Sequence, residues 1–310
     1  MTRALLLLLA LLPVAASAAT PRIVVTLAPL HALVTGVAGP AAEPHLLLRG
    51  AASPHAFSLA PSDARALARA DLVVAADPNL EKFLERPLGS LAADAAVIWL
   101  TAIEDVHRLP ARAGGQWEAH RDDTHDNHDH DHEHGHEPGQ HNPHAWLDPL
   151  NAIAFTRTLA ERLASLDPDN AGTYRANAAR QVERLQALDR DLDRQVAPVR
   201  DVPYLVFHDA YHYFEDRYGL QPIGAVAVDP ARPPGARRLA ELHDRIERTG
   251  ARCLFAEPQF EPKIVRVIHE ATGIRTAVLD PLGAELEPGP DLYDQLMRNL
   301  ADDLVECLGQ

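Results

Sequence analysis

Histidine is concentrated in one segment of this 310-residue chain, and its neighbours point to metal chemistry. Between residues 118 and 140, His alternates with Asp and Glu. Imidazole at this density is typical of sites for zinc or copper. The segment has too little apolar surface to fold by itself, so we expect a flexible loop that binds zinc weakly at several points. Its candidate secondary ligands are His120, His125, His128, His130, His132, His134, His136 and His141.

Four other side chains are candidates for one fixed metal site. His144 follows the loop and precedes an apolar Ala-Trp-Leu run, whereas His55, His208 and Asp280 follow predicted strands. Loops at the carboxyl ends of parallel strands face the ligand crevice in open α/β sheets. Three imidazoles and one carboxylate would complete a tetrahedral zinc shell. Each candidate also has a structural alternative: an exposed loop His, a buried hydrogen-bonded His, or an Asp-Pro turn.

Two carboxylates are expected to support these ligands rather than bind metal. Asp148 precedes Pro149, so it either caps the following helix or supports His144. Glu257 precedes Pro258 and either supports a ligand or has a structural role.

The elements that must position these residues follow an alternating pattern. Short apolar runs alternate with helical segments, one of them predicted over residues 80–91, up to about residue 100 and again from about residue 201. This order predicts an α/β fold with two lobes, each a mainly parallel sheet flanked by helices. A long helical pattern between them predicts one rigid helix that joins the lobes. The predicted domains are an N-terminal lobe at 20–168 with the His-rich loop at 118–140, a linking helix at 169–198, and a C-terminal lobe at 199–310.

The first residues predict export. A charged Met-Thr-Arg start, the apolar run 4–12 and Ala16-Ser17-Ala18 form a signal peptide over residues 1–19, cleaved near Ala18 or Ala19. No later apolar run is long enough to cross a bilayer, so we expect a periplasmic protein without membrane insertion. The net charge of −15 argues against binding to nucleic acid.

Only two cysteines are present, Cys253 and Cys307. In an oxidising compartment such a pair is expected to form a disulfide. The alternative is two separate buried thiols.

Together these motifs resemble the zinc-specific periplasmic solute-binding proteins of ABC importers. The resemblance covers nearly the whole mature chain and implies two lobes, a rigid linking helix and delivery of zinc to a membrane permease. It also implies that His55, His144 and His208 bind Zn²⁺. Some relatives have Glu before the first of these His residues, where this chain has Pro54, so Asp280 or water would be the fourth ligand. The segments that carry the resemblance are Ala52–Leu59, Pro61–Asp63, His141–Pro149, Phe207–Tyr211, Phe255–Phe260 and Leu279–Gly283.

The resulting hypothesis is a monomeric, non-enzymatic receptor that captures Zn²⁺ between its lobes and delivers it to an ABC permease. Manganese receptors of the same cluster have a carboxylate at the position of His208, and an imidazole there favours zinc. One alternative is a zinc buffer or metallochaperone that acts through the His-rich loop. Another is a zinc hydrolase with Glu257 as its base, although the chain has no H-E-x-x-H motif.

Overall fold

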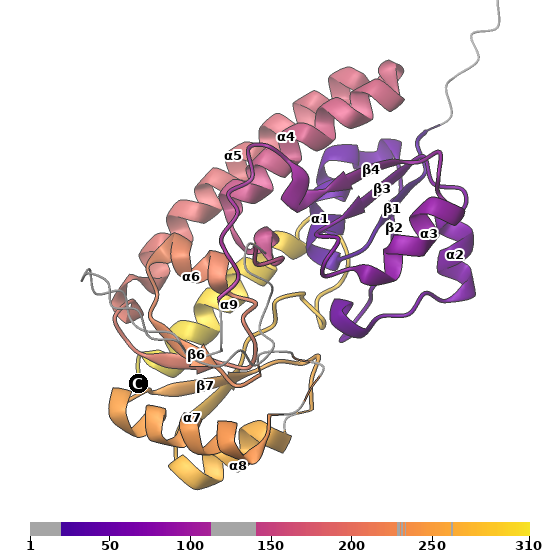
Figure 1. The fold of residues 1–310 in the computed structure, drawn as a ribbon. Helices are drawn as coiled ribbons and strands as arrows, with labels where there is room; N and C mark the ends of the chain where they lie inside the picture. Colours follow the sequence, from indigo (N-terminus) through magenta and orange to yellow (C-terminus); the bar gives the residue numbers. More distant parts are fainter. Residues whose placement is uncertain (1–19, 113–140, 228–229, 231, 233, 262) are drawn as a thin grey trace, which may run out of the picture.

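The protein consists of two α/β lobes side by side, with long helices along one flank (Figure 1). In this computed structural model, residues 20–310 are described apart from 113–140, 228–229, 231, 233 and 262. The predicted signal peptide and the histidines from His120 to His136 lie outside the described residues. No helix in the described part of the chain has the length and apolar character to cross a membrane.

The first lobe is built on a four-stranded parallel sheet in the order β2-β1-β3-β4. Strands β1 and β3 are runs of Ile, Leu, Val and Ala that are buried throughout. Branched side chains pack well on a pleated surface, and strands covered on both faces are almost continuously apolar. The strands are β1 (Ile23–Val25), β2 (His45–Leu46), β3 (Leu72–Ala75) and β4 (Ala96–Trp99).

The helices of this lobe are α1 (Ala28–Ala38), α2 (Pro61–Leu67) and α3 (Glu85–Ser90). Helix α3 is shorter than the sequence pattern over residues 80–91 predicts. The segment before it forms a 3₁₀ turn at Lys82–Leu84. Pro87 has no backbone N–H and is accommodated only in a first helical turn, so the regular helix cannot begin much earlier than Glu85.

Two long helices lie next to each other and lead from the first lobe into the second (Figure 1). Helix α4 (Pro149–Leu166) begins with Pro at its first position and with Asp148 as its N-cap. Helix α5 (Ala171–Val196) has 26 residues and is continued by 3₁₀ turns at both ends. The prediction of one long helix between the lobes is confirmed.

The second lobe repeats the same architecture with a parallel sheet in the order β6-β5-β7-β8. Its elements are β5 (Tyr204–Val206), α6 (His212–Tyr218), β6 (Pro222–Ala225), α7 (Ala236–Thr249), β7 (Cys253–Ala256), α8 (Lys263–Thr272), β8 (Arg275–Val278) and α9 (Leu292–Leu308). A disulfide joins Cys253 in β7 to Cys307 in α9, as predicted. The α/β prediction with two mainly parallel sheets is confirmed.

One continuous hydrophobic core extends through both lobes. It contains residues of β1 and β3, of α1, α4 and α5, and of β5, β7 and α9. Helix α9 returns from the second sheet to pack against both α1 and α5 (Figure 1). The lobes are therefore held together by buried apolar surface and not only by the connecting chain. A smaller cluster lies between the second sheet and helices α7 and α8.

The buried side chain of Glu81 binds the backbone just after the end of β3. Glu81 is fully buried, and its Oε2 accepts hydrogen bonds from the backbone N–H groups of Ala76 (2.7 Å) and Asp77 (3.0 Å). Burial raises the pKa of Glu81 to about 7, with the nearby Asp77 carboxylate adding to the shift and the hydrogen bonds opposing it.

Glu81→Gln should therefore change how stability depends on pH. The folded-state pKa of Glu81 lies above its ordinary value of 4.5. In the wild type, the contribution of Glu81 to the free energy of unfolding is therefore fully present below pH 4.5 and is lost as pH rises towards 7. Gln keeps the acceptor and does not titrate. The free energy of unfolding of the variant should rise relative to wild type by up to about 3 kcal/mol between pH 4.5 and 7.5.

Urea unfolding at several pH values measures this difference. Glu104→Gln, a change on an exposed side chain, is the control. Its curve of unfolding free energy against pH should run parallel to that of the wild type. Parallel curves for Glu81→Gln as well would contradict the raised pKa.

Candidate metal centre

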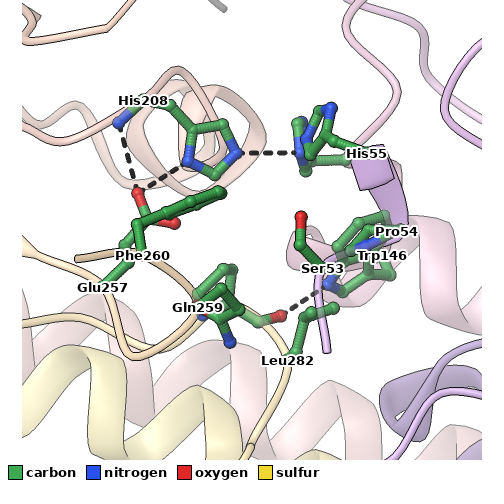
Figure 2. A pocket seen from close by; sticks show the side chains of 11 residues that line it. Ser53, Pro54, His55, Trp146, His208, Glu257, Gln259, Phe260 and Leu282 are labelled. Atoms are coloured by element: carbon green, nitrogen blue, oxygen red, sulfur yellow. Dashed lines mark hydrogen bonds and ion pairs between the residues drawn. The ribbon is translucent and has the colours of Figure 1, made fainter. Parts of the chain in front are cut away.

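Three of the four predicted ligands converge in the structure. One ring nitrogen from each of His55, His144 and His208 lies within 4.8 Å of the others. Their ring centroids are 5.6 Å apart for His55 and His144, 5.3 Å for His55 and His208, and 5.1 Å for His144 and His208. Figure 2 shows His55 and His208 on opposite sides of the pocket.

Each imidazole is placed by a different local structure. His55 lies in a 3₁₀ turn, Pro54–Ala56, in the loop after β2. His144 immediately precedes the 3₁₀ turn Ala145–Leu147. His208 follows β5 in the second lobe. His55 and His208 thus come from the carboxyl ends of strands in different sheets, as the position of ligand crevices in open α/β sheets predicts.

Glu257 holds the ring of His208 from behind (Figure 2). Its Oε1 lies 2.7 Å from His208 Nδ1 and 3.2 Å from the His208 backbone nitrogen. An ionised carboxylate only accepts hydrogen bonds, so Nδ1 carries the proton and the neutral ring presents Nε2 as a lone-pair donor. Both groups are buried, with side-chain exposures of 6% and 0%.

Asn142 does the same for His144. Its Oδ1 accepts hydrogen bonds from the His144 backbone N–H (3.0 Å) and from Nδ1 (2.9 Å). Asn142 is not among the site residues predicted from the sequence. Asn before Pro is a frequent start of turns in which the side chain bonds the backbone two residues later, and that signal could have identified it.

The two supported rings face each other at a spacing that suits one metal ion. His144 Nε2 and His208 Nε2 are 3.3 Å apart. In a tetrahedral zinc site with Zn–N bonds of about 2.0–2.1 Å, ligand nitrogens are separated by about 3.3–3.4 Å. Two neutral rings with both lone pairs at this separation repel each other, and a cation between them removes the repulsion.

The walls of the pocket are mainly apolar and closely packed. Trp146 is fully buried with its ring centroid 5.2 Å from that of His144. Its Nε1 donates a hydrogen bond to the carbonyl of Pro281 at 2.9 Å. Phe260 contacts His208 edge to face. These walls restrict access of water to the imidazoles and so strengthen charge interactions within the pocket.

The remaining predicted site residues have other partners in the structure. Asp280 is not in the group of three imidazoles. Its carboxylate accepts hydrogen bonds from Gln259 Nε2 and from the backbone N–H groups of Leu282 and Ala284. Asp148 caps α4 by accepting from Leu150 N, so of its two predicted roles the capping one is observed. His141 lies 2.6 Å from the buried carboxylate of Asp77.

A charged cluster lies directly behind His208. Arg112 contacts Asp209 Oδ1 at 3.2 Å and Glu215 Oε2 at 2.6 Å. Burial raises the pKa of Asp209 to about 6, and the positive charge of Arg112 opposes that rise. Burial alone would lower the pKa of Arg112, but Glu215 and Asp209 raise it above its ordinary value. This cluster fixes the loop that carries His208.

Comparison with known proteins is consistent with this geometry. A family model described as zinc-uptake complex component A, periplasmic, matches residues 23–307. This chain belongs to that family. The resemblance found in the sequence is therefore confirmed, and it extends over nearly all the described residues.

Named relatives agree with the family match. A high-affinity zinc uptake system protein ZnuA of Brucella suis is 43% identical over 306 residues, covering 93% of this chain and 92% of the relative. One from Paracoccus denitrificans is 40% identical and covers 95% of this chain and 94% of its own length. Among solved structures, a crystal structure of ZnuA has a TM-score of 0.75 at 24% identity, covering 92% of this chain and 98% of that one. This last likeness shows the fold.

Changing Glu257 tests whether support of His208 matters for zinc binding. Glu257→Gln keeps an acceptor for Nδ1 but removes the negative charge that makes the ring a better donor. Glu257→Ala removes the acceptor as well. We expect zinc affinity to fall in that order, reaching about 10–100-fold for Ala.

Competition titration with a chromophoric zinc chelator gives the affinities. Glu261→Gln, a nearby change on an exposed side chain, is the control. Wild-type affinity in Glu257→Ala would contradict a supporting role.

Proposed function

We propose that this protein is a periplasmic receptor that binds one Zn²⁺ ion with high affinity between its lobes and passes it to an ABC permease. Family membership and the names of the relatives support zinc uptake. The observation that carries the proposal is the convergence of three imidazoles from distant parts of the chain, two of them with Nε2 atoms at the spacing of zinc ligands.

The donor set supports zinc over harder metals. Three imidazole nitrogens form a borderline site, whereas manganese and magnesium favour carboxylate and water oxygens. Copper binds nitrogen donors at least as tightly by the Irving–Williams order, so selection against copper in the cell must come partly from metal availability.

We infer that water, and not Asp280, is the fourth ligand. Asp280 already accepts three hydrogen bonds that hold the turn after β8. Ser53 Oγ and Gln259 Oε1 line the same pocket, are buried, and have no hydrogen-bond partner among the described residues. Figure 2 shows the Ser53 hydroxyl directed towards the side of the pocket where His55 lies. A metal-bound water would offer its two hydrogens to such oxygens.

The cellular setting follows from the family. The family description names a periplasmic component of an uptake complex, which fits a signal peptide over residues 1–19, cleaved near Ala18 or Ala19, and a permease partner. We propose that the receptor works as a monomer and is not an enzyme. Glu257, the residue a hydrolase would need as its base, instead bonds His208 through its Oε1.

Removing one imidazole should matter more than removing the Asp280 carboxylate. His208→Ala deletes a donor to the metal, so we expect zinc affinity to fall by more than about 100-fold. That loss exceeds the range typical of residues that hydrogen-bond a ligand without contacting the metal. Asp280→Asn keeps the size of the side chain and one acceptor oxygen but removes its charge. If water is the fourth ligand, this variant should lose less than about 10-fold. Calorimetry in competition with a chelator measures both, and the reverse order would mean that Asp280 binds the metal.

Deleting residues 118–140 separates a receptor from a zinc buffer. A receptor keeps one tight site after the deletion, because His55, His144 and His208 all lie outside the segment. The weaker additional sites should disappear. Zinc stoichiometry by calorimetry and metal analysis provides the measurement. Loss of the tight site with the tract would favour a buffer or metallochaperone that acts through the His-rich loop.

A further inference from the structure

The side chain of Asn142 makes hydrogen bonds on both sides of the cleft. It is 3% exposed, and its Oδ1 accepts from the backbone nitrogen and Nδ1 of His144. Its Nδ2 donates to the backbone carbonyl of Asp209 at 2.7 Å. Asp209 directly follows His208 in the second lobe. A single amide therefore contacts the His144 segment with its oxygen and the His208 segment with its nitrogen.

We propose that Asn142 is a positioning residue that sets the distance and angle between His144 and His208 across the cleft. The proposal rests on the function proposed above and goes beyond it, because it assigns the alignment of two imidazoles from separate lobes to one side chain. Asn142 itself does not touch the metal.

The chemistry of the position requires an amide. His144 needs an acceptor for two N–H groups, and the Asp209 carbonyl needs a donor. Asn carries both in one short planar group. Asp would supply only acceptors, and an apolar residue would leave buried polar groups without partners, which is costly in a medium of low dielectric.

The backbone of Asn142 is itself held by hydrogen bonds, which limits how far its side chain can shift with its neighbours. Its N–H donates to Leu109 O at 2.8 Å, and its carbonyl accepts from Tyr213 OH at 2.8 Å. Tyr213 also accepts from Leu109 N at 3.1 Å, so the two chain segments and the tyrosine form a closed set of bonds. A residue fixed on all sides transmits the position of one imidazole segment to the other.

The Asp209 segment is held from a second direction as well. Arg112 binds the Asp209 carboxylate and the buried Glu215. The backbone carbonyl of Asp209 meets Asn142 while its side chain meets Arg112. The loop that carries His208 therefore has its orientation set by contacts from the segments on either side of the His-rich tract.

Two substitutions separate the two halves of this role. Asn142→Ala removes the acceptor for His144 and the donor to Asp209. Asn142→Asp keeps the acceptor, and its charge makes the ring of His144 a better donor to metal, but two oxygens would then face each other at the Asp209 carbonyl.

Asn151→Ala is the matched control. Asn151 is 1% exposed, and its amide also makes three hydrogen bonds, to His107 and Ala145, without contacting an imidazole ring of the site.

Zinc affinity is measured by chelator competition, and coordination geometry by the d–d absorption of the Co²⁺ form. We expect Asn142→Ala to bind zinc about 10–100-fold more weakly and to show an altered Co²⁺ spectrum. Asn142→Asp should also bind more weakly than wild type, despite the better acceptor. Asn151→Ala, even if it unfolds at a lower temperature, should keep wild-type affinity and spectrum.

Asn142→Asp with affinity equal to or above wild type would overturn the proposal, because the amide would then support His144 alone. Asn142→Ala with a wild-type spectrum and affinity would overturn it too. If the Ala variant does not fold, the Asp variant decides. Failure of the wild type itself to bind one zinc tightly would instead overturn the proposed function, and the inference with it.

Discussion

The arrangement of this site depends on where the imidazole protons are held. A neutral imidazole has one proton, and only the other nitrogen can donate a lone pair to a metal. Glu257 fixes the proton of His208 on Nδ1, and Asn142 does so for His144. Both Nε2 atoms then point to the same place, 3.3 Å apart. Without these two acceptors the rings would be free to exchange tautomers and rotate, and the spacing that suits zinc would be lost.

A preformed site needs lobes that do not move far relative to each other. The continuous core through α1, α5 and α9 joins the two lobes. Two hydrogen bonds next to the site also join the lobes. Trp146 Nε1 donates to Pro281 O, and Tyr293 OH donates to Trp146 O. Trp146 packs against His144, so the position of one imidazole depends on bonds to the other lobe. Binding then requires little reorganisation, which favours high affinity.

The sequence predicted the elements and the three imidazoles well, because both leave local signals. Buried parallel strands are short runs of Val, Ile and Leu, and His after such a strand lies at the carboxyl edge of a sheet. Asp280 also follows a strand, but its position did not indicate that its carboxylate accepts hydrogen bonds from the turn around it. Asn142 was missed because its role depends on Asp209, a partner 67 residues away. No spacing rule connects the two positions. The shortened α3 reflects Pro87, a local signal that the apolar periodicity concealed.

The described residues on either side of the His-rich tract contact both lobes. Before the tract, Arg112 is bound by Asp209 and Glu215 of the second lobe. After it, His141 is bound by Asp77 at the end of β3 in the first lobe, and it pairs with Pro110 through a backbone bridge. Asn142, which follows at once, contacts His144 and the Asp209 carbonyl. The carboxylates of Glu215 and Asp77 are almost fully buried, so a displaced partner would leave a buried polar group without its hydrogen bond. On the proposal made for Asn142, the segments that flank the tract are also the ones that position His144 and His208 relative to each other.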